Sequence, residues 1–169
     1  VMEHSQQVAV LAHALALIDT KVYGNTPDVT KTVLCAMYHE CAEVMTGDLP
    51  TPVKYFNGDI TSAYKDIEKR SEKRLTDSLP GEVKCEVSEL VSGGSEYERR
   101  LVKYADTLAA YVKCTEELAQ GNSEFAEAER STLAKLHAYD SPEVEYFLSV
   151  FVPSFGQSLD VLSRGLSKT

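Results

Sequence analysis

The sequence of 169 residues carries 26 acidic and 17 basic side chains, which gives a formal net charge of −9 and a pI near 4.9. Hydrophobic residues make up 43% of the chain, a composition typical of a folded domain and not of a disordered one. The basic residues are scattered and the acidic excess repels phosphate backbones, so we expect no nucleic-acid partner. The length fits one domain covering residues 1–169.

Helical periodicity runs through nearly the whole sequence and predicts an all-α fold, a single compact multi-helix bundle. Apolar residues lie almost all round the first expected helix, residues 3–19, which predicts that it is buried in the middle of the bundle. Thr26 as N-cap and Pro27 as first helical residue predict a second helix that continues to Thr46 and ends at Gly47.

The rest of the chain reads as further helices separated by turns. Two prolines make residues 48–56 a stiff connector, and a third helix is expected over 59–79 with apolar residues facing inward. Residues 82–91 form at most a short helix, and 96–119 form a long one. The residues of the long helix expected to face inward are Leu101, Val102, Ala105, Leu108, Ala109 and Val112. Further helices are expected to begin at Ser123 and at Ser141-Pro142, with Pro153 dividing the last helical stretch. The inward residues of the third helix are Ile60, Tyr64, Ile67 and Leu75.

The cysteine pattern and the hydropathy bound the cellular setting. The cysteines at 35, 41, 85 and 114 show no metal-binding spacing, and we expect reduced thiols in a cytoplasmic protein. The longest apolar run, Val8 to Ile18, is too short to cross a bilayer, and no signal peptide is visible, so no membrane association is expected. The sequence begins at Val1, and we expect further residues upstream of it.

Polar residues in the apolar second helix are the chemical signal of the sequence. His39 and Glu40 are followed by Glu43 one turn later, so an imidazole and two carboxylates can project from one side of a helix. Such groups are costly to bury unless something pairs with them, and a metal ion would do so. His4 in the first helix and Asp106 in the long helix add a nitrogen and a carboxylate, a set that suits a divalent transition metal.

The other two histidines have ordinary explanations. We interpret His13 as a core or cap histidine whose ring finds a hydrogen-bond partner in the protein. His137 is interpreted as a surface residue near a helix end.

The stretch from Ala36 to Phe56, which contains Thr-Gly-Asp-Leu-Pro-Thr-Pro-Val-Lys-Tyr, resembles the HD superfamily of metal-dependent phosphohydrolases and, within it, the bacterial 5′-deoxynucleotidases of the YfbR type. Glu3-His4-Ser5, the run from Lys103 to Tyr111 and the run from Phe151 to Phe155 are also similar to that group. The resemblance spans essentially the whole chain.

The resemblance implies a metal-dependent 5′-nucleotidase that hydrolyses deoxyribonucleoside 5′-monophosphates with metal-activated water, and a homodimer. It implies one divalent ion, such as Co²⁺ or Mn²⁺, held by the metal ligands His4, His39, Glu40 and Asp106. It implies that Glu43 and Asp48 are catalytic, and that the substrate contacts His4, Asp48, Leu49, Pro50, Thr51 and Asp106. An arginine and an aromatic residue that bind phosphate and select deoxyribose in this group would lie upstream of His4.

Two alternatives stay open. The family's His-Asp pair is His39-Glu40 here, one methylene longer, so the chain could be a degenerate HD domain that binds nucleotide without efficient turnover. An HD phosphodiesterase ranks lower, because the sequence offers one metal set and no further histidine cluster for a second ion.

Overall fold

The computed structural model describes residues 1–155, 157 and 161, and every regular element in that part of the chain is a helix. The all-α prediction is therefore confirmed. The helices are α1 (Met2–Lys21), α2 (Val29–Tyr38), α3 (Glu43–Thr46), α4 (Thr51–Lys54), α5 (Gly58–Asp77), α6 (Gly81–Val91), α7 (Glu96–Ala119), the 3₁₀ turn η1 (Ser123–Phe125), α8 (Ala126–His137), α9 (Pro142–Val150) and α10 (Val152–Phe155). None of these helices is both long and apolar enough to span a membrane.

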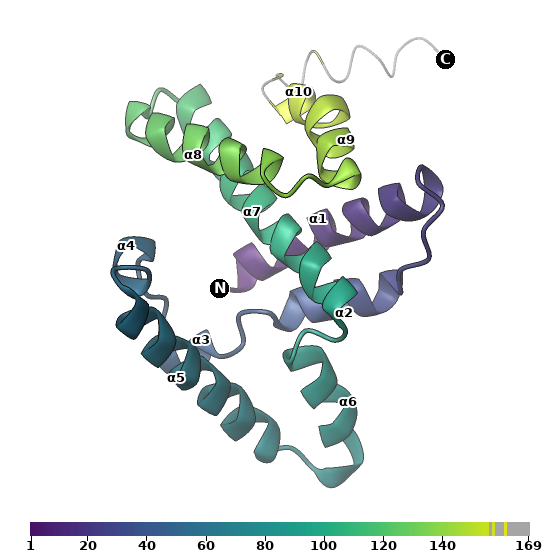
Figure 1. Ribbon diagram of the computed structural model, residues 1–169, viewed down its shortest axis with the longest axis vertical. Coiled ribbons are helices and arrows are strands. Elements are labelled where there is room, and N and C mark those ends of the chain that lie inside the picture. Colours follow the sequence, from purple (N-terminus) through teal and green to yellow (C-terminus); the bar gives the residue numbers. More distant parts are fainter. Residues whose placement is uncertain (156, 158–160, 162–169) are drawn as a thin grey trace.

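The hydrophobic core lies where α1, α2 and α7 cross (Figure 1), with α8 packed on α7 and α9 packed on α1. Burying apolar side chains along both α1 and α7 supplies most of the driving force for this arrangement. A capping box formed by Ser95 and Glu98 begins α7, which satisfies backbone N–H groups that would otherwise lack partners. The leucine and valine side chains with under 2% exposure are Val8, Leu15, Leu101, Leu108, Leu136 and Val144.

A second group of helices, α3 to α6, lies to one side of this core (Figure 1). Helix α5 packs against α3, α4 and α6, and α6 in turn packs against α2. The chain enters this group through the turn after α2 and through Gly47, whose φ of 71° lets the backbone leave α3. This turn brings the His39-Glu40 pair to the boundary between the two groups of helices.

The second helix is shorter than predicted. It begins after Asp28, whose carboxylate caps the backbone N–H of Lys31 at 2.9 Å, so the proposed cap at Thr26 and Pro27 was wrong. It ends at Tyr38, and the backbone then makes three-residue turns in which Cys41 N donates to Tyr38 O and Glu43 N donates to Glu40 O. The physical reason is a side chain, because the imidazole of His39 donates to the carbonyl oxygen of Ala36.

Helix α1 is not buried all round. Val10 is 59% exposed and Leu17 is 38% exposed, so α1 lies at the edge of the core and one of its apolar faces is exposed. His13 lies on that open side and is exposed, so its interpretation as a core or cap histidine was wrong. His137 is exposed at the end of α8 and pairs with Glu145, as a surface residue should.

The inward face of α5 also differs from the prediction. Ile60 and Ile67 are 37% and 50% exposed, whereas Tyr64 is buried at 8%. Glu68 and Glu72, four and eight residues after Tyr64, lie on one flank of its face, and Ile60 and Ile67 lie on the other flank. Apolar and charged residues alternate along α5, so its sequence did not reveal this polar face, which is turned toward the site described below.

The remaining boundaries follow the sequence closely. The long helix α7 spans the predicted 96–119, and its expected inner residues are buried. Helix α9 begins at Pro142, and Pro153 follows the break between α9 and α10. The connector 48–56 contains the short helix α4, and 82–91 forms a regular helix. All four cysteines are free, as expected.

Candidate active site

The four predicted metal ligands come from three elements of the core and meet at one point. His4 lies in the first turn of α1, Asp106 lies in the middle of α7, and His39 and Glu40 lie in the turn after α2. Because α1 packs against both α2 and α7, residues 102 positions apart in the sequence come into hydrogen-bond contact.

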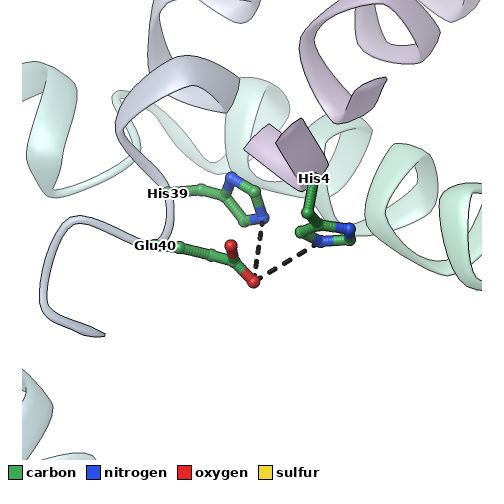
Figure 2. Close-up of side chains that lie close together, drawn as sticks. All are labelled: His4, His39 and Glu40. Carbon is green, nitrogen blue, oxygen red and sulfur yellow. Dashed lines mark ion pairs between the residues drawn. The ribbon is translucent and has the colours of Figure 1, made fainter. Parts of the chain in front are cut away.

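The distances among these groups are those of a compact polar cluster. His4 Nε2 donates to Asp106 Oδ1 at 3.0 Å and lies 3.4 Å from Glu40 Oε1. His39 Nε2 lies 3.9 Å from the same Glu40 oxygen. Figure 2 shows the Glu40 carboxylate directed at both imidazole rings, and one ligand atom each from His4, His39 and Glu40 lies within 4.8 Å of the others.

The orientation of the His39 ring fits a metal ligand. Its Nδ1 donates to Ala36 O at 2.6 Å, so Nε2 of the neutral ring carries a lone pair. That Nε2 is buried and has no hydrogen-bond partner among the described residues. A buried polar atom without a partner is costly, and a cation at this point would satisfy it. Two imidazoles and two carboxylates are a donor set suited to a divalent transition metal, so the residues fit the ion.

The charges around His4 show how a proton competes for the same place. The hydrogen bond to Asp106 raises the pKa of His4; partial burial acts against this shift, and the charges of Glu40 and Asp106 add to it. A protonated imidazole cannot ligate a metal, so a metal ion must displace this proton when it binds.

Glu43 lies beside the cluster although the helix that was expected to align it with His39 is broken. It begins α3 and lines a polar cavity of about 170 Å³ together with His39, Glu40 and Asp106. Burial raises the pKa of Glu43, and the charges of Glu40 and Asp48 raise it further. A carboxyl group with a raised pKa next to a charged site is suited to proton exchange.

The segment expected to contact the substrate follows Gly47 directly. Asp48 is exposed and Leu49 is half-buried, and neither lines the polar cavity, although Asp48 is near enough to influence Glu43. Pro50 O accepts hydrogen bonds from Val53 N and Lys54 N and so begins α4. The backbone of Thr51 lies in α4, whereas its side chain lies outside the described part of the structure.

Three further residues of this site were not predicted. Lys54, Glu68 and Glu72 line the same polar cavity, Lys54 from the end of α4 and the two glutamates from α5. The spacing of Tyr64, Glu68 and Glu72 by four residues was the available signal, because it places all three on one face of a helix. Ile60 and Ile67 lie on the other flank of Tyr64, so the apolar pattern predicted an inward face rotated away from the two glutamates.

Comparisons with known proteins identify the family of this chain. The model of a family described as 5′-deoxynucleotidase YfbR-like matches residues 1–155. The chain is 49% identical over 166 residues to a protein named 5′-deoxynucleotidase YfbR from Escherichia coli, covering 97% of this chain and 83% of the relative. A protein of the same name from Shigella boydii gives the same values.

A solved structure supports the fold. An HD-domain phosphohydrolase from Listeria innocua superposes with a TM-score of 0.79 at 22% identity, covering 96% of this chain and 79% of that one. This structural similarity shows the all-α architecture, whereas the family model and the sequence relatives show the family. The chain belongs to the YfbR-like family of 5′-deoxynucleotidases.

Proposed function

We propose that this chain hydrolyses deoxyribonucleoside 5′-monophosphates to the deoxynucleoside and inorganic phosphate, with His4, His39, Glu40 and Asp106 holding one divalent ion. The observation that carries the proposal is the buried Nε2 of His39, which has no hydrogen-bond partner in the described part of the chain and faces the Glu40 carboxylate beside His4. The names of the relatives support the substrate class.

A bound divalent ion would supply positive charge for the phosphate and lower the pKa of a nearby water. Glu43 takes the proton from the attacking water as its oxygen bonds to phosphorus. The phosphorus–O5′ bond breaks, and Glu43 returns the proton to the leaving 5′-oxygen. Burial and the charges of Glu40 and Asp48 raise the pKa of Glu43, which makes its carboxylate a better proton acceptor than an unperturbed glutamate.

The segment after Gly47 is assigned to the nucleotide. Asp48 accepts a hydrogen bond from the attacking water or from the sugar 3′-hydroxyl, and Leu49, Pro50 and Thr51 contact the nucleotide beside it. Since Pro50 begins α4 and Pro52 follows it, the backbone of this segment is restricted before substrate arrives. His4 and Asp106 are also assigned to contact with the substrate.

The proposal includes the identity of the ion and the state of the protein. Mn²⁺ or Co²⁺ is the proposed ion, because mixed nitrogen and carboxylate ligands favour first-row transition metals over the all-oxygen sites typical of Mg²⁺. Residues 1–169 act as one HD-type domain, and the protein works as a homodimer in the cytoplasm.

Phosphate release from the full sets of deoxyribo- and ribonucleoside 5′-monophosphates tests the reaction. Protein loaded with Mn²⁺ or Co²⁺ should release phosphate from the deoxy substrates, and chelated protein should not. Absence of turnover in protein that contains bound metal would overturn the enzymatic proposal, and equal turnover of both sugar series would overturn the deoxyribose preference.

Substitution of the proposed proton carrier tests the mechanism. Glu43→Gln should lower kcat by about 10² to 10⁴ while the metal content stays the same, because proton transfer contributes a factor of that size. Glu116→Gln, on the exposed side of α7, is the matched control. Unchanged kcat in Glu43→Gln would exclude the role given to Glu43.

A further inference from the structure

We infer that Lys54 binds the phosphate group of the substrate, an inference that rests on the proposed function. Lys54 lines the polar cavity that also holds His39, Glu40, Glu43 and Asp106. It is the only basic residue among the described residues that line this cavity, apart from the histidine itself.

The cavity is strongly acidic, so phosphate can bind there only beside a positively charged group. Its lining carries five carboxylates and a single lysine. A phosphate monoester is a dianion near neutral pH and is repelled by this lining. A divalent ion between the carboxylates of Glu40 and Asp106 brings that pair to neutrality. The other carboxylates of the lining still repel phosphate, so positive charge within the cavity is needed beside any that an arginine upstream of His4 supplies. Lys54 is placed to supply it, and ammonium groups bind phosphate through charge-assisted hydrogen bonds. The five carboxylates are Glu40, Glu43, Glu68, Glu72 and Asp106.

The side chain of Lys54 is fixed by α5 before any ligand arrives. Its Nζ donates to Glu68 Oε1 at 2.7 Å and lies 4.8 Å from the centre of the Tyr64 ring. Only 25% of the Lys54 side chain is exposed. Although partial burial acts to lower it, the hydrogen bond to Glu68 and its charge raise the pKa of Lys54, so the ammonium keeps its proton. A cation held in place loses little conformational entropy when phosphate binds.

Lys54 is also tied to the proposed nucleotide segment. It is the last residue of α4, whose first residue is Thr51, and its carbonyl oxygen accepts a hydrogen bond from Thr61 Oγ1 at 3.0 Å. On the other side of the segment, the Tyr64 hydroxyl donates to Gly47 O at 3.1 Å. The same two turns of α5 therefore hold both ends of the segment from Gly47 to Lys54, with the cation at its far end.

A purely structural role for the Lys54–Glu68 pair makes different predictions. If the pair only fastens α4 to α5, then loss of either partner disturbs the segment in the same way. If Lys54 binds phosphate, loss of Glu68 leaves the cation in place and relieves its competition for Nζ. The two variants Lys54→Met and Glu68→Gln thus separate the two roles.

The experiment is isothermal titration calorimetry of Mn²⁺-loaded protein with inorganic phosphate and, separately, with an uncharged deoxynucleoside. Lys54→Met should weaken phosphate binding by roughly tenfold or more, because a hydrogen bond to a charged group is worth about 1.5–3 kcal/mol. Deoxynucleoside binding should stay within about twofold, and Lys54→Arg should recover most of the phosphate affinity. The exposed Lys65→Met is the matched control.

Three results would overturn the inference: unchanged phosphate affinity in Lys54→Met, equal weakening of phosphate and deoxynucleoside, or the same weakening in Glu68→Gln. Thermal unfolding checks that each variant is folded, and Lys54→Gln replaces the methionine variant if that one unfolds. Since binding of inorganic phosphate is measured without turnover, failure of this inference is distinguishable from failure of the proposed hydrolysis.

Discussion

The imidazole Nδ1 of His39 donates to the carbonyl oxygen of Ala36 at 2.6 Å, and this contact has two consequences. It occupies a carbonyl that a continuing helix would use, so α2 ends at Tyr38 and the chain turns. It also places the proton of the neutral ring on Nδ1, so the buried Nε2 faces Glu40 with a free lone pair. The contact that ends the helix is therefore also the one that orients the proposed metal ligand.

Removal of the His39 ring should release the metal. His39→Ala removes one of the two nitrogen ligands, and the ion then has only His4, Glu40 and Asp106 to bind it. We therefore expect Mn²⁺ affinity to fall by well over tenfold. Metal content after dialysis, measured by elemental analysis, checks this result. His137→Ala is the control, because His137 is exposed and pairs only with Glu145 in the described structure. Equal metal content in both variants would contradict the assigned site.

The negative charge of the Glu40 carboxylate, more than the length of the Glu40 side chain, should determine the affinity for the metal. Glu40→Gln removes the negative charge that lies 3.4 Å from His4 Nε2, and we expect at least tenfold weaker Mn²⁺ binding by calorimetry. Glu40→Asp keeps the charge and withdraws it by about 1.5 Å, the length of one carbon–carbon bond, so its affinity should stay within severalfold of the parent. If the glutamine variant binds Mn²⁺ as well as the parent, Glu40 is not a ligand.

Asp19 is a buried carboxylate far from this site, and its neutralisation should stabilise the protein. The residue is 1% exposed; Oδ1 accepts from Asn25 Nδ2 at 2.6 Å, whereas Oδ2 has no partner among the described residues. It also lies in the last turn of α1, where a negative charge opposes the helix dipole. Asp19→Asn keeps the bond from Asn25 and should add about 1 kcal/mol, or roughly 2–4 °C in Tm.

Thermal unfolding of Asn25→Ala provides the counterpart. It removes the donor that Asp19 has and should lower Tm, because the carboxylate then loses its described partner. A decrease in Tm for Asp19→Asn as large as that for Asn25→Ala would show that the charge of Asp19 is needed.

The junction of α5 and α6 gives a prediction for acid stability. Hydrogen bonds from Lys73 and then Lys84 lower the pKa of Asp77 to about 2. A lowered pKa in the folded state contributes stability above the unfolded pKa near 3.8, and this contribution disappears as the pH falls through about 2. Asp77→Asn should therefore have a lower Tm than the parent at pH 7, and the two values should converge between pH 4 and pH 2.

The control for this titration is Asp66→Asn on the same helix, since no ion pair of Asp66 is found in the described part of the chain. Its Tm should track that of the parent at every pH. A constant gap between Asp77→Asn and the parent down to pH 2 would show that the ion pairs of Asp77 contribute nothing that titrates. The effect is small because Asp77 is exposed.

The helical fold was predictable because its signals are local. Apolar periodicity, Gly47 and the prolines located most helices, and α7 was predicted with its inner face correct. The end of α2 was not predictable from such signals, because it depends on the rotamer of His39 and its bond to Ala36 O. Helix propensity predicted that the helix continues to Thr46, whereas the structure ends it at Tyr38, eight residues earlier, where the His39 side chain bonds to the backbone.

The ligand set was predicted from residue types placed at intervals on three apolar helices, and the structure brings His4, His39, Glu40 and Asp106 together. Lys54 was missed because its place in the site depends on how α5 packs, and the exposed Ile60 and Ile67 indicated the wrong inward face. The hydrophobic pattern predicts orientation well in α7, which is in the core, and poorly in α5, which packs mainly against the peripheral helices α3, α4 and α6.

The contact between His4 and Asp106 joins the first turn of α1 to a residue 102 positions later in α7. An ion held there acts as a cross-link that closes a loop of more than half the described chain, and it cannot form until α1 and α7 have packed. The ion should therefore slow unfolding more than it speeds folding, since its ligands assemble late. The rate at which the metal exchanges should therefore report on how often α1 and α7 separate at the core.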